Sequence, residues 1–139
     1  MSKVSYSHIF LTLCFLLTVE TSFNLSCMDA SNGRLYELES VEYVHIENCQ
    51  ELKLDLFKYI PSKILNLNII NVKNLSIVTG PQSLENIGNI FLIQSLISEN
   101  TNFVSKAGSN IFIENCEFKK NLKIFSMGSD LLDGGVHLR

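Results

Sequence analysis

Four short stretches of this chain share one pattern of apolar and polar positions. In each stretch aliphatic residues alternate with other residues, and the stretches recur with a nearly constant period of about 23 residues. Such alternation is typical of a β-strand that turns one face toward a core. The pattern therefore predicts four strands built on one repeat, at Val44–Cys49, Leu67–Val72, Ile90–Ser95 and Ile111–Cys116.

The repeat also assigns a role to each position within a stretch. If the first residue is position 0, positions 0 and 2 are always aliphatic and should face inward, whereas positions 1 and 3 should face outward. An amide residue at position 4 suits a turn, because Asn tolerates the left-handed region. If successive strands stack about 4.8 Å apart, these amides come into register and can hydrogen-bond to one another. They are Asn48, Asn71, Gln94 and Asn115.

The connections between the stretches favour parallel pairing. They are about fifteen residues long and contain no tight hairpin signal such as Asn-Gly, which an antiparallel sandwich of similar strands would need. Turn-forming residues interrupt them at Pro61, Gly80-Pro81, Gly88 and Gly108. One strand layer cannot bury its own inner face, so several must stack. We therefore predict an all-β fold, a short parallel β-solenoid of about four rungs.

Two families share this period. The segment Ser109–Asn121 (SNIFIENCEFKKN) resembles the rungs of right-handed parallel β-helix proteins, the architecture of pectin-degrading enzymes and many surface proteins. The rival is the leucine-rich repeat, an α/β solenoid, whose template fits residues 41–52 and 64–75. Its last aliphatic position is taken by Ser98 and Lys119 in the two later rungs, which favours the β-helix.

The N-terminus carries the features of a secretory signal. Lys3 precedes an apolar run from Ile9 to Val19, and this length suits the central region of a signal peptide, whereas a membrane span needs about 18 residues or more. We predict a signal peptide at 1–22 and a secreted, extracellular chain without a stable membrane span. The remaining boundaries are an N-terminal cap at 23–43, β-solenoid repeats at 44–121 and a C-terminal tail at 122–139.

Cysteine spacing and glycosylation triplets agree with secretion to the extracellular space. Removing the signal removes Cys14 and leaves three cysteines. Cys27 precedes Cys49 by close to one period, so a Cys27–Cys49 disulfide could fasten the cap to the first rung. Cys116 would then be a buried thiol, too far from Cys49 to pair with it. Asn24-Leu25-Ser26 and Asn74-Leu75-Ser76 are N-glycosylation acceptor triplets, at Asn24 and Asn74.

Composition argues against several kinds of function. The 139-residue chain has a formal net charge of −3 and 18% charged residues, so no basic surface for nucleic acid is indicated. Its four Asp residues lie outside the three later stretches, and Glu47 and Glu114 share a column without converging. His45 is expected at the surface, and no metal-ligand spacing or phosphate loop is present. We predict no enzyme activity and no cofactor; the β-helix resemblance implies, as the alternative, a carbohydrate-active protein or a degenerate relative of one.

One outward-facing group of residues points to binding. At positions 1 and 3 the later stretches carry large apolar side chains, which would form one patch unless the cap or the tail covers them. Such a patch suits a protein partner or self-association, while carbohydrate remains possible as a ligand. We therefore expect a non-catalytic extracellular binding or structural module, with a leucine-rich-repeat recognition module as a further alternative. The patch consists of Ile70, Phe91, Ile93 and Phe112.

Overall fold

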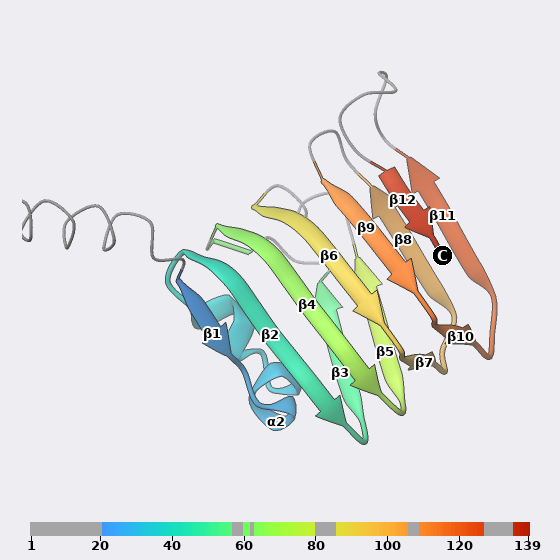
Figure 1. The fold of residues 1–139 in the computed structure, drawn as a ribbon, viewed down its shortest axis with the longest axis horizontal. Helices are drawn as coiled ribbons and strands as arrows, with labels where there is room; N and C mark the ends of the chain where they lie inside the picture. The colour runs from blue at the N-terminus through green and yellow to red at the C-terminus, as the bar shows by residue number, and fades with distance from the viewer. Residues whose placement is uncertain (1–20, 57–59, 62, 80–85, 106–108, 127–134) are drawn as a thin grey trace, which may run out of the picture.

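The computed structural model describes residues 21–56, 60–61, 63–79, 86–105, 109–126 and 135–139. Within these residues the chain winds into a parallel β-solenoid of about four turns, which confirms the predicted fold class (Figure 1). The predicted signal segment lies outside the described residues up to residue 20.

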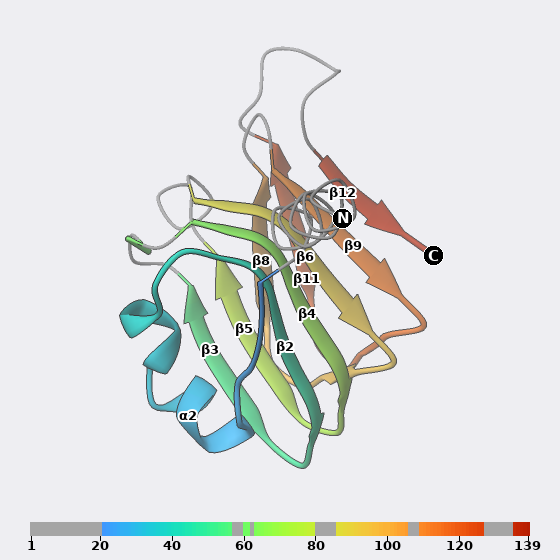
Figure 2. The same ribbon diagram turned by 60° about the vertical axis from the view of Figure 1, so that its left-hand side comes forward.

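Three parallel sheets form the walls of the solenoid. The largest, called here sheet A, has six strands in the order β1-β2-β4-β6-β9-β12, and Figure 2 shows it curving along the molecule. Its strands are β1 (Ser22–Asn24), β2 (Val41–Cys49), β4 (Ile64–Val72), β6 (Ile87–Ile93), β9 (Asn110–Glu114) and β12 (Gly135–Leu138).

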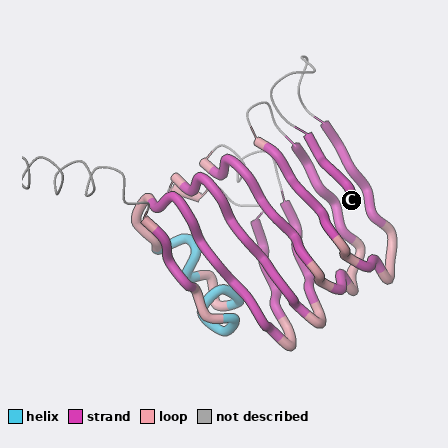
Figure 3. The backbone as a smooth tube through the Cα atoms, in the orientation of Figure 1, coloured by secondary structure: helices cyan, strands magenta, loops and turns pink. Residues whose placement is uncertain are grey.

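The return strands build the opposite wall. Sheet B has the order β10-β7-β5-β3, and β11 pairs with β8 in a two-stranded sheet. Sheet B contains β3 (Leu52–Leu56), β5 (Leu75–Thr79), β7 (Leu96–Ile97) and β10 (Glu117–Phe118), and the two-stranded sheet contains β8 (Thr101–Ser105) and β11 (Leu122–Ser126). A leucine-rich repeat would return by helical segments, whereas these returns are strands (Figure 3). The leucine-rich-repeat alternative is therefore wrong for this chain.

The register of sheet A follows the repeat. Val44 pairs with Leu67, Leu67 with Ile90, and Ile90 with Ile111. All side chains at positions 0 and 2 of the four stretches are buried, with at most 3% of their surface exposed. Because alternate residues of a strand face opposite sides, positions 1 and 3 lie on the outer face. The sequence prediction of the inner and outer faces is thus confirmed.

Each long strand of sheet A bends into sheet B at a left-handed residue. The residues with positive φ other than glycine in the described part of the chain are the four position-4 amides, with φ of 58°, 54°, 49° and 51° for Asn48, Asn71, Gln94 and Asn115. The Asn71 Nδ2 group donates to Asn48 Oδ1 at 2.8 Å. Among the described residues Gln94 and Asn115 do not extend this ladder; the Gln amide lies one methylene further from the backbone.

The N-terminal end of the solenoid is closed by helical turns. Helix α2 (Cys27–Ser31) begins after Ser26, whose side chain accepts a hydrogen bond from Asp29 N at 3.1 Å, as an N-cap does. The 3₁₀ turn η1 (Arg34–Glu37) follows, and the buried side chains of Ala30 and Leu35 belong to the core. The predicted cap at 23–43 thus contains α2 and η1 together with most of β1 and the start of β2.

The C-terminal segment differs from the expected tail at 122–139. Strand β11 pairs with β8, and β12 pairs with β9, so the winding continues past residue 121. Val136 lies beside Ile111, and the step in sequence between these two residues is longer than any step between the earlier rungs.

Candidate binding face

The outer face of sheet A brings the four predicted patch residues together. In the register, Ile70 lies beside Ile93, and Phe91 lies beside Phe112. All four side chains are half-buried, which leaves part of each one open on this face. The predicted patch therefore exists as a contiguous group on β4, β6 and β9.

The aromatic side chains of this face form a stacked column. The Phe91 and Phe112 rings have centroids 4.8 Å apart with an interplanar angle of 9°. The imidazole of His137 continues the column on β12, with its ring centroid 4.6 Å from that of Phe112 and an angle of 14°. Stacked rings of this kind add about 0.5–1.5 kcal/mol per pair beyond their buried area. His137 was not among the predicted patch residues, because β12 was not recognised.

A ladder of amides runs beside the aromatic column. Asn89 Nδ2 donates to Asn66 Oδ1 at 2.8 Å, and Asn110 Nδ2 donates to Asn89 Oδ1 at 3.3 Å. The Asn110 Oδ1 atom is within 3.2 Å of His137 Nε2, so it can accept the imidazole N–H. The three Asn residues precede position 0 of their rungs, and with His137 the ladder links four successive strands of the face. It ties the outer face of sheet A together through side-chain hydrogen bonds.

A hollow of about 480 Å³ adjoins the patch at the C-terminal end of the face. Phe91, Phe112 and His137 line it together with the charged residues Glu114 and Arg139. Arg139 follows β12, and its backbone N–H donates to Ile113 O at 2.8 Å. A hollow lined by aromatic rings together with charged groups is suited to receive a side chain of a binding partner.

Two carboxylates flank the isoleucines of the patch. Glu47 lies beside Ile70 and Glu114 lies beside Ile93, so the column reads acid, isoleucine, isoleucine, acid across four strands. Both carboxylates are exposed, and neither forms an ion pair with another described residue. The apolar stripe is therefore bordered by unneutralised negative charge.

The same two carboxylates are poorly placed for hydrolysis. Glu47 and Glu114 stand three rungs apart, or about 14 Å at the spacing of paired strands, whereas glycosidases hold their two carboxylates about 5–9.5 Å apart. No group of three or more His, Cys, Asp or Glu residues in the described ranges could hold a metal ion. His45 is half-buried and lies 3.2 Å from Asn68, through its Nδ1 atom.

The predicted Cys27–Cys49 pair forms a disulfide. Its Cα atoms are 5.7 Å apart, and the bridge connects α2 to the end of β2. Cys116 is a free thiol in the same inner column as Cys49. It is half-buried, whereas the sequence predicted a buried thiol. Burial raises the pKa of the Cys116 thiol, against the opposing effect of hydrogen bonds to the backbone.

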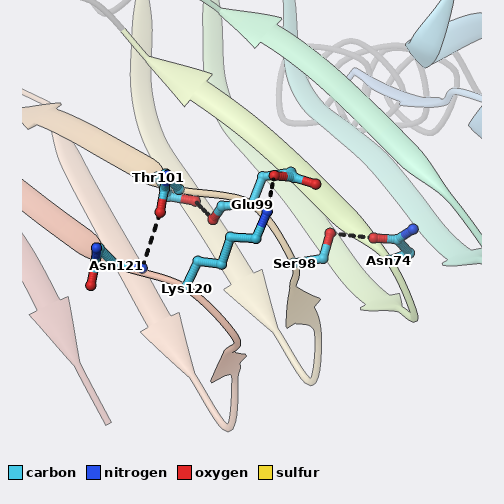
Figure 4. Close-up of polar contacts among 7 residues, drawn as sticks. Asn74, Ser98, Glu99, Thr101, Lys120 and Asn121 are labelled. Carbon is cyan, nitrogen blue, oxygen red and sulfur yellow. Dashed lines mark hydrogen bonds and ion pairs between the residues drawn. The ribbon is translucent and has the colours of Figure 1, made fainter.

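The glycosylation triplets lie at two different places on the molecule. Asn24 is exposed on β1 and pairs in register with His45, so it stands on the outer face of sheet A. Asn74 is exposed in the turn between β4 and β5. Its Oδ1 atom accepts a hydrogen bond from the Ser98 hydroxyl of the next rung (Figure 4).

Polar contacts also link the turns of neighbouring rungs near Asn74 and Ser98 (Figure 4). Lys120 Nζ lies 2.8 Å from Glu99 Oε2, and this interaction lowers the pKa of the Glu99 carboxyl, first through the hydrogen bond and then through the charge. Thr101 N donates to Asn121 O at 3.0 Å, and the Thr101 hydroxyl donates to Glu99 O at 3.1 Å. The contacts of Lys120 with Glu99 and of Thr101 with Asn121 join neighbouring rungs.

Comparisons with known proteins did not identify a family for this chain. No protein-family model matches this chain, and the searches of curated proteins and of solved structures found no significant match. Among the described residues, no helix has the length and apolarity needed to cross a membrane.

Proposed function

We propose that this chain is a secreted, extracellular, non-catalytic binding or structural module that acts through the outer face of sheet A. The observation that carries the proposal is the contiguous patch of Ile70, Phe91, Ile93 and Phe112, with its side chains half-buried on that face. Apolar patches that remain open to solvent mark interaction surfaces. The apolar run at the N-terminus supports secretion.

The partner that suits this face is a protein surface with apolar side chains bordered by Lys or Arg. The isoleucines and phenylalanines would be covered by its apolar groups, and one of these could enter the hollow beside Phe112. Its cations would face the exposed carboxylates of Glu47 and Glu114. Complementary charge of this kind favours the rate of association and the choice of partner. A second copy of the chain is the other protein that the patch could bind.

A relation to the right-handed parallel β-helix family rests on the resemblance of Ser109–Asn121. The resemblance would imply a carbohydrate-active protein, but the carboxylate separation described above does not favour hydrolysis. We therefore propose a binding role for the solenoid. Phe112 has a ring stacked on each of its faces, Phe91 on one and His137 on the other, so its faces are not open to a sugar ring.

Charged substitution of the patch should weaken binding strongly while the fold remains. In Phe91→Asp with Phe112→Asp, two carboxylates would replace the apolar centre of the interface, and we expect the affinity for the partner or for a second copy to fall by about thirtyfold or more. Self-association is measured by sedimentation of the purified secreted protein, and partner binding by quantitative co-purification.

A control variant on the other wall separates binding from general damage. Val78→Asp places the same charge on an exposed residue of β5 in sheet B, and it should leave binding unchanged. Because the aromatic stack contributes to stability, the milder pair Ile70→Ser with Ile93→Ser should be measured as well. If the secreted and folded patch variants keep both their partners and their assembly state, the patch is not the interface.

A further inference from the structure

The triplet Asn74-Leu75-Ser76 has a defined position in the folded solenoid. Asn74 is exposed in the turn, whereas the Leu75 side chain is fully buried and anchors the start of β5. Ser76 is half-buried on the outer side of β5, two residues after Asn74. The acceptor side chain thus stands in solvent on a turn whose next residue belongs to the core.

The hydrogen bonding of Asn74 uses only one end of its amide. Oδ1 accepts from the Ser98 hydroxyl, and in Figure 4 the amide nitrogen points away from Ser98. Asn74 Nδ2 makes no hydrogen bond with another described residue. Nδ2 is the atom that receives the sugar in N-glycosylation, so the contact to Ser98 and a glycan can exist together.

We propose that Asn74 carries an N-linked glycan, and this rests on the proposed passage through the secretory pathway. The co-reactant is a lipid-pyrophosphate-linked oligosaccharide. A bond forms between Asn74 Nδ2 and the anomeric carbon of the first sugar, and the bond from that carbon to the pyrophosphate oxygen breaks. Nδ2 loses one proton, and the lipid pyrophosphate is the leaving group.

The site is compatible with the binding face, because Asn74 lies beyond the end of β4 at Val72. A glycan on this turn extends from the corner between sheets A and B and leaves the patch on sheet A open. Asn24 differs, since it stands on the outer face itself beside His45. A sugar on Asn74 therefore adds a bulky, solubilising group to the molecule without occupying the surface of the proposed function.

The test is expression of the full chain in secreting eukaryotic cells, followed by peptide mass spectrometry after treatment with peptide N-glycosidase. We expect Asn74 to be converted to Asp by the enzyme. Ser76→Ala should lose this glycan while it keeps Asn74 and its contact to Ser98. Ser76→Thr and Asn24→Gln should retain the glycan on Asn74, since both leave its acceptor triplet intact.

The experiment distinguishes a failure of the glycan proposal from a failure of the proposed secretion. A secreted protein whose Asn74 stays unmodified overturns the glycan and leaves the proposed function standing. A chain that is found only in the cytosol contradicts the proposed secretion and removes the basis for the glycan as well. A glycan that persists on Asn74 in Ser76→Ala would show that the triplet does not direct the modification.

Discussion

Leu67→Ala is expected to lower the free energy of unfolding by about 2–5 kcal/mol, the range for large-to-small substitutions in a packed core. Leu67 is at position 0 of the second rung and is fully buried, with Val44 and Ile90 as its neighbours in the register. Truncation removes apolar contacts with the rungs on both sides and leaves a cavity between them. Urea-induced unfolding followed by circular dichroism measures the loss.

Leu65 provides a matched control for this substitution. It is the same residue type on the same strand, β4, but 51% of its surface is exposed. Leu65→Ala should change the stability by no more than about 0.5 kcal/mol, as most surface substitutions do. Equal losses for the two variants would contradict the burial of Leu67 and the exposure of Leu65 on this strand.

Loss of the Cys27–Cys49 disulfide is expected to cost about 3 kcal/mol, because an open chain gains conformational entropy on unfolding that a closed loop of this length lacks. The bridge joins cysteines with a sequence separation of 22 and holds α2 against the first long strand. The double variant Cys27→Ser with Cys49→Ser should therefore unfold at a lower urea concentration. Its stability should no longer respond to a reducing agent, which destabilises the unmodified protein.

Cys116→Ser is the matched control, since Cys116 is a free thiol. It should keep the full response to the reducing agent, because the bridge remains. Peptide mapping under non-reducing conditions gives a direct check of the connectivity. A Cys49–Cys116 link in that map would rule out the register, which places these residues three rungs apart.

The strand pattern and the turns of this fold could be read from the sequence because each depends on local chemistry. Aliphatic residues at positions 0 and 2 need only alternate to face one core, and the structure buries all of them. The turn at Asn71 requires a positive φ, which Asn tolerates better than most residues. The grouping of Phe91 with Phe112 followed from the same register.

The features that could not be predicted from the sequence depend mainly on contacts between segments far apart in the chain. His137 completes the aromatic column only because β12 pairs with β9, and the spacing of that last rung departs from the repeat. The ladder through Asn89 was not predicted, because the sequence does not give the distance between amides. Strand β1 was missed for a different reason: its first residue, Ser22, was assigned to the signal peptide.

Stacking of the rungs in register is tested most directly by nuclear Overhauser contacts in the isotopically labelled protein. The side-chain amide protons of Asn89 should show contacts to both Asn66 and Asn110, and those of Asn71 to Asn48, because these amides lie on neighbouring parallel strands. Backbone contacts should connect Val44 with Leu67 in the parallel sense. Absence of the amide contacts, together with backbone contacts that pair these strands in opposite directions, would contradict the solenoid.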